Sequence, residues 1–326
     1  MRPAPLQVAP MSEWIPLTEV RTVAVLGAAG TVGASWTALF LHHGFDVIAQ
    51  DPSPALGERL HEFSERAWPA LQRLQPMATP RGKLMLTSEV AGLAGAQFVQ
   101  ENVPENESLK RRVLAELDAL LDPGVVIASS TSALLRSQIV ADCARCPERV
   151  MVGHPFNPPH LLPLVELVGD TPNSSPVRWA MEFYRRLGKH PIVVRKEVIG
   201  HIANRLNSSI YREAVSLVEQ GIASVEDIDA AMTHGPGLRW AVMGPHLLYH
   251  LGGGPGGIAH YLEHLGPSQV KRWSELKTPE LTEDLKRQLI DGVAQEAGGR
   301  GVSELETQRD AALIALIEAM RRLPNG

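Results

Sequence analysis

A glycine-rich turn near the start of the chain limits the possible folds more than any other part of the sequence. Residues 22–26 (TVAVL) form an apolar run typical of a buried strand, and residues 32–43 have the apolar spacing of a helix. Between them, Gly27, Gly30 and Gly33 are spaced G-x-x-G-x-x-G, one residue longer than the common G-x-G-x-x-G. Such glycines let the backbone approach a pyrophosphate, which the N–H groups and dipole of the helix N-terminus stabilise. We therefore expect all three glycines to bind a dinucleotide cofactor.

An acidic residue after the second predicted strand indicates which dinucleotide binds. Residues 46–49 (DVIA) form that strand, and Asp51 follows it. A carboxylate at this point accepts hydrogen bonds from the ribose hydroxyls and repels a 2′-phosphate. The sequence therefore predicts NAD as the cofactor and Asp51 as one of its ligands. The alternative is that Asp51 is a solvated turn residue before Pro52.

The chain changes character near residue 196. Before it, short β-rich runs alternate with helical stretches, which is typical of a parallel sheet covered by helices. We expect one further strand to begin at residues 98–99. Others are expected at residues 125–128, 150–153, 165–168 and 192–194. After Lys196 the apolar spacing is helical to the end. We expect an α/β protein: a flexible Pro-rich tail at 1–18, a Rossmann-type, mostly parallel sheet domain at 19–196, and an all-helical domain at 197–326.

Composition excludes several classes of function. The net charge of −5 offers no basic face for nucleic acid or anionic lipid. No apolar run approaches the roughly 20 residues that span a bilayer, and the N-terminal segment lacks the apolar core of a signal peptide. We therefore expect a cytoplasmic protein without membrane or nucleic-acid partners. Cys143 and Cys146 have no second pair to complete a metal site, so we expect reduced thiols and no metal.

The segment Gly153-His-Pro-Phe-Asn-Pro-Pro159 and the following strand carry the most chemical information. A histidine can act as a general base near neutral pH, because its unperturbed pKa is about 6.5. It requires a carboxylate to fix its tautomer and to stabilise the imidazolium form. Glu166, on the next predicted strand, can supply that carboxylate. We expect His154 and Glu166 to form a catalytic pair.

These residues resemble the 3-hydroxyacyl-CoA dehydrogenase family over nearly the whole chain after the tail. The most specific part of this resemblance is the block H-P-F-N-P…V-E-L-V. In the family a histidine and a glutamate in this block form the catalytic pair, and His154 and Glu166 have the same spacing. The resemblance implies roles for five further residues. Ser132 in the S-S-T-S turn and Asn204 in N-R-L match catalytic positions, and Asn157, Glu105 and Lys110 match cofactor contacts. From the residues alone, Ser132 could be only a helix cap and Asn204 only a polar helix residue.

Within that family, the chain is most similar to the carnitine dehydrogenase branch. The similarity lies in S-T-S-A-L-L at 130–135, L-L-P-L-V-E-L-V-G at 161–169 and L-R-W-A-V-M-G at 238–244. The helical arm after the second strand carries scattered charges of both signs, which disfavours a CoA thioester. A trimethylammonium group requires aromatic faces, for which Phe156, Trp240 and Tyr249 are candidates. A free carboxylate requires a guanidinium, for which we expect Arg239.

The resulting hypothesis is NAD-dependent oxidation of the 3-hydroxyl of a small carboxylate, with L-carnitine as the expected substrate. His154 takes the hydroxyl proton, while Ser132 and Asn204 hydrogen-bond the same oxygen. L-Gulonate, 3-hydroxybutyrate and 3-hydroxyacyl-CoA are the alternative substrates, since gulonate dehydrogenases share V-R-K-E-V-I-G-H-I-A-N-R-L. A non-catalytic, crystallin-like NAD-binding protein is the alternative from a different class. The resemblance also implies a homodimer formed through the helical half.

Overall fold

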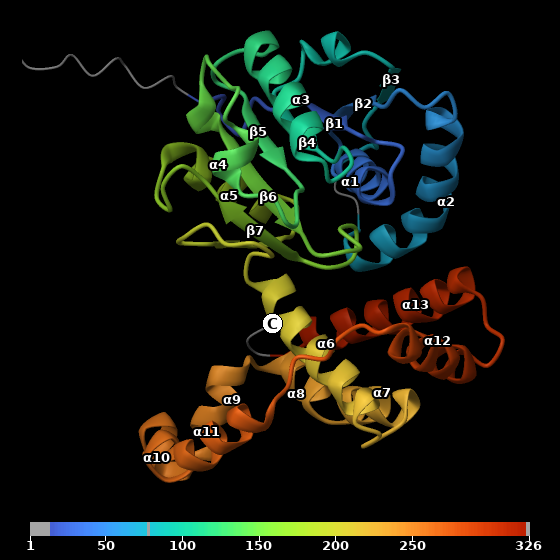
Figure 1. Ribbon diagram of the computed structural model, residues 1–326. Helices are drawn as coiled ribbons and strands as arrows, with labels where there is room; N and C mark the ends of the chain where they lie inside the picture. Colours follow the sequence, from blue (N-terminus) through green and yellow to red (C-terminus); the bar gives the residue numbers. More distant parts are fainter. Residues whose placement is uncertain (1–13, 77–78, 324–326) are drawn as a thin grey trace, which may run out of the picture. The chain divides into compact units, whose positions relative to one another are not determined.

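The computed structural model describes residues 14–76 and 79–323, which form two compact units (Figure 1). The first unit ends at Arg205 and the second begins at Leu206. The division falls inside helix α6 (Ala203–Glu219), a few residues beyond the expected boundary at residue 196. Each unit is described by itself below.

The first unit contains one eight-stranded sheet among its described residues. Its strands are β1 (Thr22–Leu26), β2 (Asp46–Gln50), β3 (Leu84–Thr87), β4 (Phe98–Glu101), β5 (Val126–Ser129), β6 (Val150–Pro155), β7 (Leu164–Val168) and β8 (His190–Val193). The spatial order is β3-β2-β1-β4-β5-β6-β7-β8, and every neighbouring pair is parallel except β6–β7, which is antiparallel. The predicted Rossmann-type, mostly parallel sheet is confirmed. Strand β3, at one edge of the sheet, was not predicted from the sequence.

Both faces of the sheet are covered by helices. In β1, Val23 and Val25 belong to one apolar cluster, whereas Ala24 and Leu26 belong to a second cluster on the opposite face. Burial on both faces explains why β1 reads as a continuous apolar run rather than an alternating one. The first cluster is closed by α1 (Thr31–His42), α2 (Leu56–Leu74) and α5 (Ser175–Arg186). The second is closed by α3 (Glu107–Leu120) and α4 (Arg136–Ile139).

Part of the expected N-terminal tail belongs to the packed domain. Residues 1–13 lie outside the described residues. Trp14, Ile15 and Leu17 pack against the first apolar cluster, and the Trp179 indole N–H donates to the Ile15 carbonyl over 2.7 Å. The expectation that the tail extends to residue 18 is therefore wrong for residues 14–18. Their apolar side chains are partly buried against this cluster, which proline content alone did not reveal.

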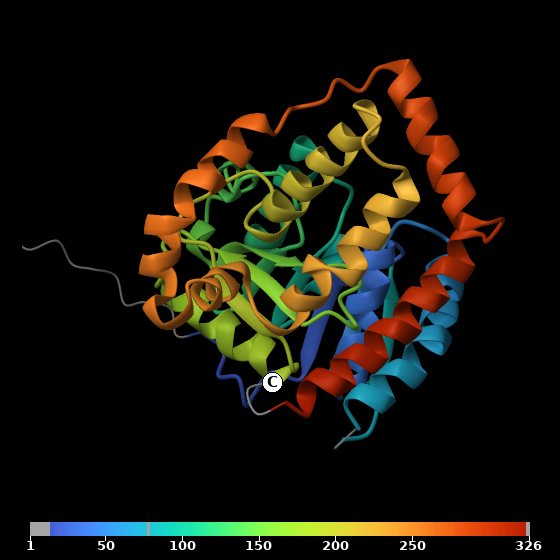
Figure 2. The ribbon, with the colours of Figure 1, turned by 90° about the horizontal axis from the view of Figure 1, so that it is seen from below.

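The second unit is helical, as expected. It contains the larger part of α6, followed by α7 (Val225–His234), α8 (Pro236–Val242), α9 (Pro245–Gly252), α10 (Gly257–His264), α11 (Gly266–Glu275), α12 (Glu283–Ala297) and α13 (Val302–Arg321). Gly298 and Gly299, with φ of 59° and 81°, form the tight turn between α12 and α13 (Figure 2). Among the described residues, none of these helices is both long and apolar enough to cross a membrane.

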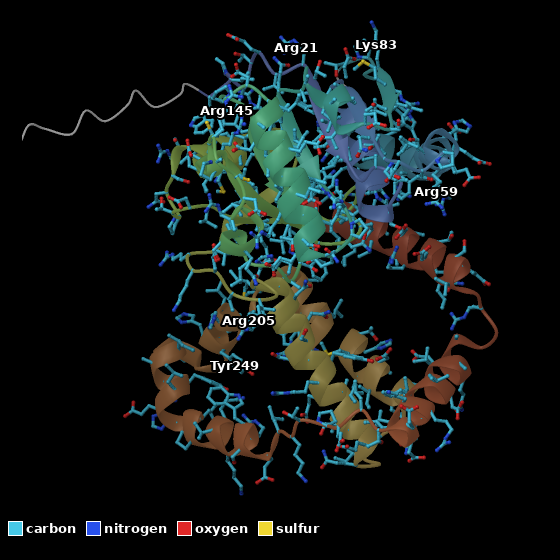
Figure 3. All side chains as sticks on the ribbon, turned by 45° about the horizontal axis from the view of Figure 1, so that its top comes forward. Arg21, Arg59, Lys83, Arg145, Arg205 and Tyr249 are labelled. Atoms are coloured by element: carbon cyan, nitrogen blue, oxygen red, sulfur yellow. The ribbon has the colours of Figure 1, made fainter. Side chains whose placement is uncertain are left out.

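The amino and carboxyl ends of the parallel strands lie on opposite sides of the sheet. Arg21 and Lys83 immediately precede β1 and β3, so they mark the amino ends of the strands (Figure 3). Gly27, Asp51, Asn102 and Ser130 follow β1, β2, β4 and β5 at the carboxyl ends. In an open parallel sheet, ligands bind beyond the carboxyl ends of the strands. The residues predicted to bind the cofactor and to catalyse the reaction lie at these carboxyl ends.

Candidate active site

The glycine-rich turn has the close backbone packing that a dinucleotide requires. Gly27 has φ of 73°, and a Cβ atom on it would lie 2.7 Å from the Asn102 carbonyl. A Cβ on Gly33 would lie 2.3 Å from the Gly27 carbonyl oxygen. Gly30 precedes α1 without a side-chain hydrogen bond capping the helix, so the first N–H groups of α1 have no side-chain acceptor from that residue. This turn fits the pyrophosphate of NAD.

Asp51 is oriented by the same turn. Its Oδ2 accepts from the Ala29 N–H over 3.1 Å, and its Oδ1 accepts from the Ser53 N–H over 2.9 Å. These bonds hold a carboxylate beside the glycine turn at the end of β2. A negative charge there suits the ribose hydroxyls of NAD and opposes a 2′-phosphate.

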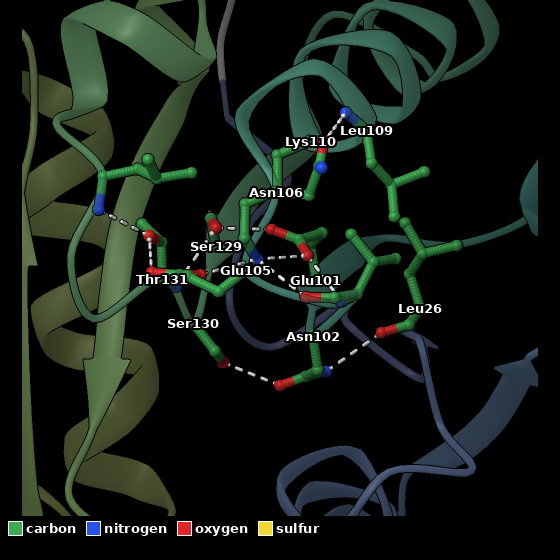
Figure 4. Close-up of polar contacts among 12 residues, drawn as sticks. Leu26, Glu101, Asn102, Glu105, Asn106, Leu109, Lys110, Ser129, Ser130 and Thr131 are labelled. Atoms are coloured by element: carbon green, nitrogen blue, oxygen red, sulfur yellow. Dashed lines mark hydrogen bonds and ion pairs between the residues drawn. The ribbon is translucent and has the colours of Figure 1, made fainter. Parts of the chain in front are cut away.

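Glu105 binds the turn that contains Thr131 (Figure 4) and the following residue, Ser132. Its Oε1 accepts from Thr131 Oγ1 over 2.6 Å and from the N–H groups of Ser132 and Ala133 over 2.9 and 2.8 Å. Burial raises the pKa of Glu105. The hydrogen bonds from Thr131 and Ala133 and the charge of Lys110 together lower it by more, so the net shift of the pKa is downward. Glu105 is therefore an ionised acceptor that fixes the backbone around Ser132.

Lys110 lies in the interior of the domain beneath this turn. Its Nζ donates to Glu101 Oε1 over 2.8 Å and to the Val103 carbonyl over 3.0 Å, and it lies 3.5 Å from Glu105 Oε2. Lys110 is 1% exposed and Glu101 is fully buried. Glu101 also accepts from Ser129 Oγ and from the Val103 N–H (Figure 4). In this arrangement Lys110 supports Glu105 from inside. The sequence analysis did not single out Glu101, although its position three residues before Pro104 at the end of β4 could have drawn attention to it.

His154 and Glu166 face one another across the antiparallel pair of strands. They are direct register partners in β6 and β7, and His154 Nδ1 lies 2.9 Å from Glu166 Oε2. Glu166 Oε1 accepts from the N–H groups of Ile202 and Ala203, over 2.8 and 3.0 Å, where α6 begins. Both side chains are buried.

The charge state of Glu166 fixes the tautomer of His154. Burial raises the pKa of Glu166, but the hydrogen bonds from His154, Ala203 and Ile202 lower it by more, so its pKa lies below the ordinary value. An ionised carboxylate can only accept, so His154 Nδ1 carries the proton. The lone pair of Nε2 is thereby available to accept a proton.

The loop between β6 and β7 carries Phe156 and Asn157, which are half-buried and exposed. It is anchored on both sides. Ser35 Oγ of α1 lies 2.8 Å from the His160 N–H, which donates to it, and 2.9 Å from His160 Nδ1. Lys189 Nζ, which is buried, donates to the carbonyls of Pro159 and Leu162. The segment next to His154 is therefore held from α1 and from the start of β8.

The remaining predicted site residues lie on helices. Asn204 lies in the first turn of α6, directly after the two N–H groups that bind Glu166. Arg239 and Trp240 lie next to one another on α8 in the second unit. Ser132, His154, Glu166 and Asn204 thus belong to the first unit, as does the expected substrate contact Phe156, whereas Arg239 and Trp240 belong to the second.

Comparisons with known proteins agree with this architecture. Residues 22–198 match the NAD-binding domain of 3-hydroxyacyl-CoA dehydrogenase, and residues 200–296 match the C-terminal domain of the same family. The chain is 46% identical to an L-carnitine dehydrogenase of Nocardiopsis dassonvillei over 307 residues, 93% of each protein. It is 43% identical to an L-carnitine dehydrogenase of Pseudomonas aeruginosa, covering 94% of this chain and 95% of the relative.

The chain belongs to the 3-hydroxyacyl-CoA dehydrogenase family. The predictions of an NAD-dependent dehydrogenase and of NAD as its cofactor are confirmed at this level. A solved structure of similar architecture is the NAD+-dependent dismutase 5-formyl-3-hydroxy-2-methylpyridine 4-carboxylic acid 5-dehydrogenase. It has a TM-score of 0.77 and 27% identity, over 93% of this chain and 99% of that one.

One residue beside the His154–Glu166 pair was not predicted from the sequence. His201 is 2% exposed, and its ring centroid lies 5.1 Å from that of His154. Its place between Gly200 and Ile202 gave a weak signal, because histidine has no strong preference for the interior or the surface.

Proposed function

We propose that this protein oxidises the 3-hydroxyl of L-carnitine to the ketone of 3-dehydrocarnitine with NAD as hydride acceptor. The observation that supports the reaction type is the buried His154–Glu166 pair, with Nδ1 of His154 held 2.9 Å from Glu166. A binding protein without catalytic activity has no need of a general base in this state.

In the proposed reaction His154 Nε2 removes the hydroxyl proton. NAD, which the glycine-rich turn and Asp51 would hold, would supply the two-electron acceptor for the C3–H bond, so that the C3–O bond becomes a carbonyl. His154 becomes an imidazolium, which the ionised Glu166 stabilises through Nδ1–H. Ser132 and Asn204 hydrogen-bond the reacting oxygen, and Asn157 lies on the nicotinamide side.

The choice of L-carnitine rests on two independent arguments. Relatives bearing that name share more than two fifths of their residues with this chain over nearly their full lengths. The sequence also offers the groups that such a substrate requires: a guanidinium at Arg239 for the carboxylate, and aromatic rings at Phe156 and Trp240 for the trimethylammonium group. Tyr249 (Figure 3), whose ring is tilted by 39° against that of Tyr261 with the centroids 4.8 Å apart, is a further aromatic candidate.

The arm formed by α2 and the residues after it argues against a CoA thioester. The guanidinium of Arg81 lies 4.5 Å from the Trp68 ring centroid, and that of Arg66 lies 5.8 Å from the Phe63 ring centroid. Acidic residues Glu58, Glu62 and Glu65 are interspersed on the same helix. Cations stacked on aromatic rings among carboxylates are a poor site for several phosphates.

A panel of substrates tests this proposal. NADH formation is measured with L-carnitine, L-gulonate, 3-hydroxybutyrate and 3-hydroxybutyryl-CoA, under identical conditions. We expect kcat/KM for L-carnitine to exceed that of the others by about a hundredfold or more, equivalent to about 2.7 kcal/mol of transition-state discrimination. Preferred turnover of the CoA thioester would contradict our interpretation of α2. Preference for gulonate would retain the reaction type and reject carnitine.

We also propose a homodimer and a cytoplasmic location. Several large apolar side chains of the second unit are more than half exposed, including Leu247, Leu251 and Trp273. A second copy covering them would remove this apolar surface from water. Light scattering of the purified protein measures the assembly. The NAD-binding domain that we propose is the one predicted from the sequence at residues 19–196, with residues 14–18 added by their packing. The proposed substrate and dimerisation domain is the helical part, predicted at residues 197–326, whose compact unit begins at Leu206.

A further inference from the structure

His201 has an unusual backbone conformation immediately before α6. Its φ is 49°, and it follows Gly200, whose φ is 78°. A non-glycine residue in the left-handed region costs about 1 kcal/mol or more, and such conformations concentrate at functional sites. Its side chain is 2% exposed. The conformation therefore directs an imidazole into the interior at a point where glycine would be less strained.

The hydrogen bonding of His201 defines its tautomer. Nε2 lies 3.0 Å from the carbonyl oxygen of Thr131. A carbonyl can only accept, so Nε2 carries the proton and Nδ1 carries a lone pair. Nδ1 is buried and has no hydrogen-bond partner among the described residues. Protonation would place an N–H⁺ there without an acceptor, so the ring is held neutral.

The electrostatic surroundings of His201 involve three elements of the first unit. His154 from β6 packs against it at an interplanar angle of 45°, and the carboxylates of Glu166 from β7 and Glu105 after β4 act on it. Burial has the largest effect and lowers the pKa of His201. The bond to Thr131 opposes this, His154 lowers the pKa further, and the net shift is downward.

His201 also connects the two parts of the site. Thr131, which accepts from His201, donates its hydroxyl to Glu105, the residue that fixes the Ser132 turn. The next two residues, Ile202 and Ala203, donate their N–H groups to Glu166. One side chain thus ties the Ser132 turn to the peptide segment that orients Glu166.

We propose that His201 is a positioning residue that aligns the Ser132 turn with the His154–Glu166 pair and provides a neutral ring against which His154 takes up the substrate proton. The proposal rests on the proposed function in that His154 is the proton acceptor. It adds that a second histidine, which transfers no proton itself, sets the geometry of that transfer.

Two variants separate the hydrogen bond of His201 from its packing. H201F keeps an aromatic ring against His154 but cannot donate to Thr131. H201N has a short amide that can donate, and asparagine tolerates a positive φ better than most residues. H190Q, at an exposed histidine at the start of β8, is the control.

The kinetic measurement compares kcat, KM and the Kd for NAD in all four proteins. We expect H201F to lower kcat by about tenfold or more, which is the effect typical of removing a group that orients a catalytic residue. We expect the Kd for NAD to stay within about twofold of that of the unmodified protein. We expect H201N to recover at least part of the loss. Unchanged kcat in H201F would overturn the proposal. Parallel loss of kcat, NAD affinity and melting temperature in both variants would reduce His201 to a structural residue and equally overturn it.

A measurement without substrate keeps this test separate from the proposed function. The proton on His154 Nδ1, bonded to Glu166, gives a downfield NMR signal that H154Q identifies by its loss. We expect H201F to shift or broaden that signal and H201N to preserve it. An unaltered signal in H201F would overturn the positioning role even if carnitine were not the substrate. Absence of carnitine turnover in the unmodified protein, with the NMR result as expected, would reject only the proposed function.

Discussion

The three glycines of the glycine-rich turn, Gly27, Gly30 and Gly33, have different physical requirements. Gly27 combines a positive φ with a close approach to Asn102, and Gly33 leaves no space for a Cβ atom against the Gly27 carbonyl. At Gly30 the nearest atom to an added Cβ is at 3.7 Å, an ordinary contact, and φ is −77°. The spacing of glycines in the sequence therefore does not by itself identify which of them the turn requires.

This difference leads to a prediction about NAD affinity. In G33A, an added Cβ at 2.3 Å from the Gly27 carbonyl oxygen forces the turn and α1 apart. We expect the Kd for NAD to rise about tenfold or more, which corresponds to about 1.4 kcal/mol. G30A is the matched control, and we expect its Kd to change by less than about threefold. Calorimetric titration with NAD measures both. Equal effects of the two substitutions would contradict the packing argument.

At the scale of elements, the decisive feature is the reversal between β6 and β7. Sequence patterns located both strands and suggested that His154 and Glu166 would meet. Strand direction has no local signature, so the antiparallel register that makes them direct partners could not be predicted. The edge strand β3 was missed because three of its four residues are exposed and lie on a sheet edge, where burial gives no pattern. His201 was missed because its partner, Thr131, is distant in sequence.

The anchoring of the loop between β6 and β7 gives a pH-dependent prediction. Burial lowers the pKa of Lys189 from 10.5 to about 7 in the folded protein. Between these two pH values the unfolded chain binds more protons than the folded protein, so the free energy of unfolding rises with pH because of this group. Below pH 7 the lysine is charged in both states and the full cost of its burial is present. K189M lacks this contribution.

We therefore expect the difference in unfolding free energy between the unmodified protein and K189M to increase as pH rises from 7 towards 10. Chemical denaturation at several pH values measures this difference, and other titrating groups cancel in it. K196M, at an exposed lysine, is the control and should give a difference independent of pH. A flat difference for K189M would show that the lysine keeps its proton, held by the carbonyls of Pro159 and Leu162.

At the scale of the whole molecule, the predicted site residues belong to two compact units. Those predicted for proton transfer and for the cofactor turn belong to the first, whereas Arg239 and Trp240 belong to the second. The family's two domain models meet between residues 198 and 200, and the compact units divide after Arg205. Composition and hydrophobic periodicity were sufficient to predict that a sheet domain is followed by a helical domain. They carried no information on Trp14 and Ile15, whose packing begins the first unit earlier than expected.

The central claim is that His154, oriented by Glu166, accepts the proton of the substrate hydroxyl. Its most direct test compares NADH formation by the unmodified protein, H154Q, E166Q and the control H190Q, with the Kd for NAD measured on each. We predict that H154Q lowers kcat by about a hundredfold or more and E166Q by about tenfold or more, while NAD affinity and the H190Q rate stay within about twofold. Near-normal turnover by H154Q, with folding and NAD binding intact, would contradict the account.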